Sequence, residues 1–404
     1  MELLVRRALP FVGLVLGALL ALPAHAKEGD TFRPFVSYTR YYDSNLLRLD
    51  DGVPNIQVDE NGLFFNDPQR SDQYSVLSAG VNVDWKPGRQ RVIASATKNR
   101  VRFSHYDRYD NDGSDYQLKW NWRLGNYWSG QVGATESVSQ SDFEYVKVNN
   151  QITRENQFAS ADWQFHPRLS VGLGAAAATV TNSIFPQTLL DYENQSVTAT
   201  LGYTTPKGSK LRGQFRQVDG EYPNRPPGSL VDPLYTQTEY NLLGDWSVTG
   251  KLITRGKIGY VQRENDTKSE RDFSGLNGRL SADYYPTGKT MLNWAIYREI
   301  ANSDDVNATY RLNTGTSLGA AWLATSKITL RANTTFENRS FEGSTGAGGT
   351  QRDEDVLSGS LSLSYAPVRM ATIDLGLQAG RRDSNIPVND YTFHSVFVSV
   401  RADF

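Results

Sequence analysis

The sequence has 404 residues, with 42 Lys and Arg against 44 Asp and Glu, and it contains no cysteine. A chain without cysteine has no disulfide, no thiolate metal site and no lipidated N-terminal cysteine. The near balance of charge argues against nucleic acid as a partner. The mean hydropathy of −0.50 excludes a helical membrane protein but is compatible with membrane-spanning strands, in which every second residue faces lipid.

The first 26 residues have the three parts of a secretory signal peptide. An arginine pair at positions 6 and 7 precedes an apolar run over 9–22, and the sequence PAHA follows at 23–26. We predict cleavage after Ala26, which leaves one domain over 27–404 with a net charge of −3. A membrane anchor is the alternative, but the apolar run is shorter than the about 20 residues that a spanning helix needs.

Short turn signals rich in Pro, Gly, Lys and Ser recur every 38 to 42 residues. They lie near Pro87-Gly88, Gly125-Asn126, His166-Pro167, Pro206-Lys207-Gly208, Thr249-Gly250, Pro286-Thr287-Gly288, Thr325-Ser326 and Pro367. Propeller blades repeat with a similar period, but a blade holds four short strands, and each interval here has room for two long ones. We therefore expect a repeated hairpin with a tight turn at one end and a longer polar loop at the other.

The segments beside these turns alternate between polar and apolar residues, as in 116–124 and 372–379. Alternation over about 10 residues is typical of a spanning strand, although a soluble sandwich also has one wet and one dry face. Aromatic residues near the tight turns, such as Trp85, Trp128 and Trp246, favour the membrane, because such rings prefer the headgroup level. We interpret them as an inner, periplasmic girdle.

Eight hairpins give 16 strands, and two flanking strands, over 33–42 and 391–404, make about 18. The predicted fold class is therefore all-β: a transmembrane antiparallel β-barrel of the bacterial outer membrane, with short periplasmic turns and longer extracellular loops. The terminal Phe404 closes an alternating strand and resembles the assembly signal that the barrel-insertion machinery reads. Pairing of the first strand with the last leaves no backbone edge in lipid.

A barrel of this width leaves an aqueous lumen unless loops fill it. Parity predicts a set of charged residues on the inner face, in which basic residues outnumber acidic ones: Asp84, Lys119, Arg123, Arg212, Arg216, Asp245, Arg255, Lys257, Arg331, Asp374 and Arg401. Tyr74, Tyr297 and Phe397 share that parity. The set indicates either a path for an anionic or neutral hydrophilic solute or a solvated wall of ion pairs. The aromatic residues either offer rungs to a sugar chain or pack against loops.

Catalysis is not expected. The predicted mature chain has three histidines, and His394 should face lipid with no serine two residues on, unlike the outer-membrane phospholipases. Residues 110–115, DNDGSD, are oxygen-rich but lack the EF-hand spacing, so we interpret them as an outer loop rather than a calcium site. No metal and no cofactor is predicted. Glycines within strands, such as Gly172, Gly174, Gly376 and Gly380, are expected to permit barrel curvature.

The first strand and its exit carry a recognisable stretch, FRPFVSY over 32–38 followed by YDSNLLRL over 42–49. With Asp43, Asn45, Leu46, Arg48 and Leu49 as the matching positions, it resembles the EpsL-type barrels of exopolysaccharide operons, which are grouped with the β-barrel porin 2 family. Position 47, where the family more often has an aromatic residue, is leucine here. Beyond about 18 residues, the resemblance rests on length, hairpin spacing and signal peptide.

The resemblance implies a role in exporting or assembling a secreted polysaccharide. The implied partners are outer-membrane lipid, the insertion machinery, the polysaccharide itself and a periplasmic polysaccharide-export protein. Two alternatives stay open from the residues alone: a diffusion porin for small hydrophilic nutrients, and a plugged barrel that scaffolds the export complex. The sequence does not decide between an open and a plugged pore.

Overall fold

The computed structural model describes residues 31–404 except 59–63, 227–228, 230–231, 304–307 and 343–350. The predicted signal peptide and its cleavage site at Ala26 lie outside the described residues. Within those residues, no helix combines the length and the apolar character needed to cross a membrane.

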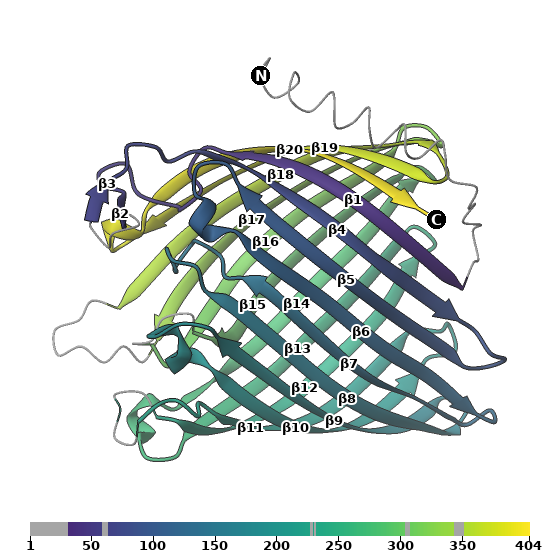
Figure 1. Cartoon of the computed structure of the whole chain (residues 1–404). Coiled ribbons are helices and arrows are strands. Elements are labelled where there is room, and N and C mark those ends of the chain that lie inside the picture. The colour runs from purple at the N-terminus through teal and green to yellow at the C-terminus, as the bar shows by residue number, and fades with distance from the viewer. Residues whose placement is uncertain (1–30, 59–63, 227–228, 230–231, 304–307, 343–350) are drawn as a thin grey trace.

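Eighteen antiparallel strands form one closed sheet (Figure 1). Each strand pairs with its sequence neighbour in the barrel, and β1 closes the ring by pairing with both β20 and β4. The strands are β1 (Phe32–Asp43), β4 (Asp72–Trp85), β5 (Arg91–Phe103), β6 (Asn111–Leu124), β7 (Trp128–Gln140), β8 (Gln151–His166), β9 (Leu169–Asn182), β10 (Tyr192–Thr204), β11 (Lys210–Glu221), β12 (Leu234–Thr249), β13 (Leu252–Asn265), β14 (Phe273–Thr287), β15 (Thr290–Asn302), β16 (Tyr310–Leu323), β17 (Ile328–Glu342), β18 (Arg352–Val368), β19 (Ala371–Ser384) and β20 (Tyr391–Asp403). The predicted fold class and strand number are confirmed.

The eight predicted tight turns all lie between paired strands at one end of the barrel, the end at which β1 begins and β20 finishes (Figure 1). In the turn between β6 and β7, Gly125 has φ +58°, a conformation that favours glycine. The other end carries the longer loops. These include a small hairpin of β2 (Ile56–Val58) and β3 (Phe64–Asn66) and four short 3₁₀ helices, η1 (Asp107–Tyr109), η2 (Gln187–Leu190), η3 (Ser269–Arg271) and η4 (Pro387–Asn389).

One interpretation of a loop is wrong. Residues 111–115 belong to β6, where Gly113 pairs with Asn99 and Asp115 with Thr97. Their composition is typical of a turn. The backbone nevertheless pairs with β5, because polar residues are compatible with a strand that is not in contact with lipid. No group of three or more potential metal-ligating side chains occurs among the described residues.

The two faces of the barrel wall differ sharply in polarity. Directly paired residues on neighbouring strands share a face. Leu118 and Trp120 are 55% and 47% exposed and lie on the outside with Leu242, Ile258 and Leu280. Lys119 alternates with them and therefore lies on the inner face. Of the aromatic residues beside the turns, Trp85, Trp128 and Trp246 are exposed at the turn end, as an interfacial girdle requires.

Two strand glycines seat aromatic rings on the inner face. A Cβ added at Gly376 would lie 2.1 Å from the ring of Phe397, and one at Gly380 would lie 2.4 Å from the ring of Phe393. Both rings belong to β20, opposite β19 in the register. The expectation that strand glycines permit curvature remains a prediction, but at these two positions the missing side chain has a packing role.

Substitution of Gly376 by valine should destabilise the barrel by about 1–3 kcal/mol, because the new side chain overlaps the Phe397 ring. The urea midpoint of the detergent-solubilised barrel measures this. Gly213→Ala, at a position with open space around the added Cβ, is the control. Adding Phe397→Ala should recover part of the loss; a double variant as unstable as the sum of the single ones would contradict the packing role.

Candidate functional site

Three outer loops fold inward and form an apolar core at the mouth of the barrel. Leu46 and Leu47 of the loop over 44–71, Tyr106 and Tyr109 of the loop over 104–110, and Phe143 of the loop over 141–150 are all buried in one cluster. The cluster packs on the inner-face side chains Tyr74 and Phe103. Burying these side chains provides the main apolar stabilisation of the loops, at about 1.5–3 kcal/mol for each large residue. Position 47, where leucine replaces the expected aromatic residue, is a core position.

The stretch that carries the family resemblance forms the turn that directs the first loop into this core. The carboxylate of Asp43 accepts hydrogen bonds from the backbone N–H of Asn45 at 2.9 Å and from two nitrogens of Arg48 at 2.8 and 2.9 Å. Arg48 has φ +53° and stacks its guanidinium 3.7 Å from the centroid of Phe393. Arg48 therefore links the turn to Asp43 at the end of β1 and to Phe393 on β20.

The amide of Asn45 closes the same turn. Its side-chain oxygen accepts from the Leu49 N–H at 3.0 Å, and its nitrogen donates to the carbonyls of Leu49 and Thr392 at 2.8 and 3.0 Å. Leu46 enters the apolar core. Each matching position thus has a definite structural task at the entrance to the lumen.

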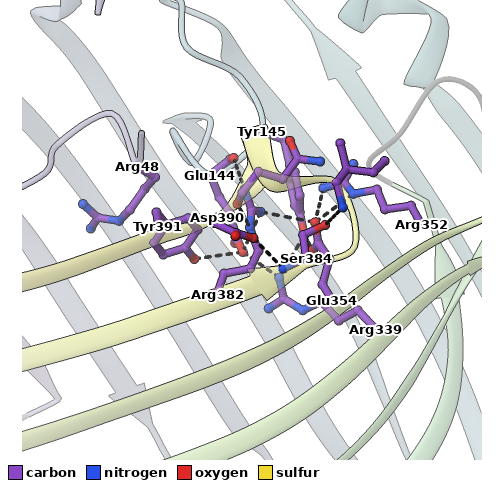
Figure 2. Close-up of polar contacts among 12 residues, drawn as sticks. Arg48, Glu144, Tyr145, Arg339, Arg352, Glu354, Arg382, Ser384, Asp390 and Tyr391 are labelled. Carbon is purple, nitrogen blue, oxygen red and sulfur yellow. Dashed lines mark hydrogen bonds and ion pairs between the residues drawn. The ribbon is translucent and has the colours of Figure 1, made fainter. Parts of the chain in front are cut away.

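The loop over 141–150 crosses the mouth and binds the opposite wall. Its hairpin strands, β7 and β8, lie far around the ring from β17 and β19. The carboxylate of Glu144 nevertheless lies 2.7 Å from a guanidinium nitrogen of Arg339 on β17 and 3.3 Å from one of Arg382 on β19, and it accepts from the Tyr391 hydroxyl at 3.0 Å. Figure 2 shows Glu144 facing these partners. We call these four residues the latch.

Further polar contacts surround the latch (Figure 2). Tyr145 donates its hydroxyl to Glu354 at 3.0 Å and accepts from Arg339 at 2.9 Å. Glu354 also contacts Arg352, at 2.7 Å, and Arg382, at 3.7 Å. Glu354 and Arg382 are almost completely buried. Because buried charges are tolerated only when well paired, this network fixes the position of the loop closely.

Burial affects the ionisable groups of the crossing loop. Burial alone would raise the pKa of Glu144, but Arg339 and Arg382 outweigh it and hold that pKa below its ordinary value. Burial lowers the pKa of Lys147 to about 7, while its ammonium donates to the backbone carbonyls of Arg48 and Glu144, which favour the charged form. The negative charge of Glu144 is therefore part of what holds the loop across the mouth.

The register puts all eleven charged residues of the predicted set on the face opposite the exposed apolar one. Several are ion-paired. Arg212 lies 2.6 Å from Asp245, and Arg216 and Lys257 lie 3.4 and 3.6 Å from Glu239, which the predicted set did not include.

Five more members of the set have polar partners. Three form ion pairs, and the other two contact the same serine hydroxyl. Arg255 pairs with Asp283 at 2.6 Å, Arg401 with Asp403 at 2.7 Å, and Asp84 with Arg91 at 2.8 Å. Arg331 and Asp374 both hydrogen-bond the hydroxyl of Ser364. Within the described part of the chain, Lys119 and Arg123 make no ion pair. The wall therefore contains both compensated pairs and uncompensated cations.

The three inner-face aromatic residues pack rather than project. Tyr74 stacks on Tyr41 with ring centroids 4.7 Å apart, and Phe397 lies 5.4 Å from Tyr41. Tyr297 donates its hydroxyl to Glu337 at 2.7 Å and lies beneath the guanidinium of Arg279. Tyr74 also packs against the loop core, as one of the two alternatives predicts, whereas the contacts of Tyr297 and Phe397 are with residues of the wall.

The residues of the latch were not singled out from the sequence. Arg339 has the parity of Arg331, and Arg382 that of Asp374, so the alternation contained a signal for both. Glu144 carried none, since its partners are 195 and 238 residues away along the chain.

A family model described as "Putative beta-barrel porin 2" matches residues 247–404, which include β13 to β20. A search of curated proteins gave no match. Among solved structures, OpdK of Pseudomonas aeruginosa with vanillate is similar, with 10% identity, a TM-score of 0.49, and coverage of 92% of this chain and 99% of that one. A BenF-like porin of Pseudomonas fluorescens has 9% identity, a TM-score of 0.48, and coverage of 92% and 98%.

The closed barrel, its apolar outer face and the matching family model define the class of this protein. It is a porin-like β-barrel of the bacterial outer membrane. The family description agrees with the β-barrel porin 2 grouping to which the first strand pointed. It describes a channel rather than an enzyme.

Asp43 and Arg48 should be energetically coupled. Their two charge-assisted hydrogen bonds are largely buried, so a double-mutant cycle of Asp43→Ala and Arg48→Ala should give a coupling of about 1–3 kcal/mol in unfolding free energy. Chemical denaturation in detergent micelles measures it. Additive effects within about 0.3 kcal/mol would show that the pair does not hold the turn.

Glu144→Gln should release the crossing loop, since it removes the carboxylate that Arg339 and Arg382 share and leaves them only their acidic partners on the wall. The expected cost in loop docking is about 1.5–3 kcal/mol. Because the chain lacks cysteine, a single Val148→Cys at an exposed loop position can carry a spin label. Its mobility should rise in the Glu144→Gln protein at neutral pH. Glu155→Gln, on the outer face of β8, is the control.

The same label reports the effect of pH. The pKa of Glu144 is lower in the docked loop than in a free one, so the docked state binds fewer protons at acidic pH. Stabilisation by Glu144 is therefore fully present above about pH 5 and is lost as the pH falls through the lowered pKa. The label should become mobile in the wild type only when the pH falls below the ordinary pKa of a glutamate. An equal acid response in the Glu144→Gln protein would contradict this assignment.

Proposed function

We propose that this barrel is an aqueous passage through which a secreted polysaccharide leaves the cell. The protein itself would first be exported from the cytoplasm, and its signal peptide would be cleaved after Ala26. The observation that carries the proposal is that residues 42–49, which resemble exopolysaccharide-operon barrels, lie at the mouth of the barrel. Asp43, Asn45 and Arg48 direct the first outer loop into the mouth of the barrel. The stretch that resembles exopolysaccharide-operon barrels thus lies at the pore entrance rather than on the lipid-facing wall.

The chemistry of the inner face supports the proposal. We assign the eleven charged residues of the predicted set to the wall of the passage. Cations without an ion pair among the described residues, such as Lys119 and Arg123, attract acidic groups, and ion-paired stretches keep the remaining wall hydrated. A polymer of hydrophilic sugar residues, neutral or acidic, suits such a wall.

Two alternatives each have support. The loop over 141–150 narrows the mouth, which favours uptake of small hydrophilic nutrients. The loop core favours a plugged barrel that scaffolds an export complex. Under the leading proposal, the barrel hands on polymer received from a periplasmic polysaccharide-export protein, and Phe404 acts as the signal for the insertion machinery.

Deletion of the gene should stop polymer from reaching the cell surface, because the outer membrane would lack the passage, while uptake of small sugars stays unchanged. Staining of surface polysaccharide and a radiolabelled sugar uptake assay measure the two outcomes. Complementation with the intact gene is the control. Normal surface polymer in the deletion strain would refute export, and a defect confined to sugar uptake would instead support the nutrient porin.

A further inference from the structure

A cavity of about 430 Å³ lies beside the crossing loop. One side consists of loop residues Ser141 to Asn150, and β8, η2 and β10 continue it with Arg154, Gln187 and Tyr192. Arg311 and Arg339 come from the other side. Its volume is within the range of small-ligand sites. It lies next to the latch, since Glu144 and Arg339 contribute to both.

The lining contains one guanidinium that is open to an anion. Arg154 and Arg339 lie in it beside two acids, Asp142 and Glu144. Arg339 and Glu144 neutralise each other at 2.7 Å. The side chain of Arg154 is exposed on the inner face of β8, and its guanidinium makes no hydrogen bond or ion pair with any residue that the structure describes. Its guanidinium is therefore available to a carboxylate, for which its planar geometry is well suited.

Ser141 offers a second, independent indication of a ligand. The residue is 5% exposed and lines the cavity, and its hydroxyl has no hydrogen-bond partner in the described structure. A buried hydroxyl without a partner costs about 1–3 kcal/mol, so a partner supplied by a bound molecule would relieve that cost.

Amide and aromatic groups complete the lining. Asn182 is held by Asp191 at 2.9 Å and by Asn150 at 2.9 Å, so it is fixed before any ligand arrives. The ring of Tyr192 lies 6.2 Å from that of Tyr222 in an edge arrangement. Hydroxyl groups suit fixed amides, and the apolar face of a sugar ring suits tyrosine.

We propose that this cavity binds one or two residues of an acidic polysaccharide, with Arg154 pairing with a uronate carboxylate and the Ser141 hydroxyl hydrogen-bonding a sugar hydroxyl. This inference rests on the proposed function in so far as the natural ligand is the exported polymer. The site would bind successive acidic sugar residues of the polysaccharide as the polymer passes the crossing loop.

Isothermal titration of the purified barrel in detergent micelles with trigalacturonate tests the site without requiring an open pore. The wild type should bind trigalacturonate and should bind the neutral maltotriose at least about tenfold more weakly, because maltotriose lacks a carboxylate. Arg154→Gln should lower trigalacturonate affinity about tenfold or more, and Ser141→Ala about threefold. Arg100→Gln, which removes an exposed cation on the outer face of β5 that does not line the cavity, should leave affinity within about twofold.

Absence of trigalacturonate binding to the wild type would overturn the site, as would equal losses in the Arg154→Gln and Arg100→Gln proteins, which would indicate bulk charge alone. A shift in gel mobility on heating verifies that each variant is folded. The outcomes are separable from those of the proposed function. Specific binding with normal surface polymer in the deletion strain refutes export but keeps the site; loss of surface polymer without specific binding does the reverse.

Discussion

Every backbone N–H and C=O group that lies in the hydrocarbon of a membrane must be hydrogen-bonded within the protein. In this chain that requirement is met by the pairing of β1 with β20, from Phe35 opposite Asp403 to Asp43 opposite Ser395, which removes the last free strand edges. Closure also divides each strand into a dry and a wet face. The alternation of Leu118, Lys119 and Trp120 is a direct consequence, since neighbouring residues meet lipid and lumen in turn.

Closure of eighteen strands creates an interior that wall side chains alone do not fill. The outer loops fill part of this interior and bury apolar residues against one another, as in the core of a soluble protein. Leu46, Leu47 and Phe143, which belong to otherwise polar loops, form a core inside the mouth with Tyr74 of the wall. The Asp43–Arg48 turn sets the direction from which the first loop enters. The shape of the passage is thus decided by loop packing.

The wall was predictable from the sequence because its determinants are local. Alternation and tight-turn signals at a spacing near 40 residues predicted the strand number, and parity placed Arg212 and Asp245 on the same inner face. Their ion pair, at 2.6 Å, is known only from the structure. The site was not predictable in the same way. Glu144 meets Arg382 across 238 residues, and no periodicity relates an outer loop to the opposite wall. Composition misled at Asn111–Asp115, where hydrogen bonds to β5 extend the strand.

Charge rather than apolar contact holds the crossing loop at its far end, and this choice has consequences for the cavity beside it. An apolar contact between loop and wall would tolerate sliding, whereas a carboxylate shared by two guanidiniums and a hydroxyl has one good geometry. Arg382 does not line the cavity, yet by fixing Glu144 it fixes Ser141 and Asn150 on the same short loop. The shape of the cavity therefore depends on a buried network outside it, and protonation of Glu144 at low pH would weaken the contacts that hold that shape.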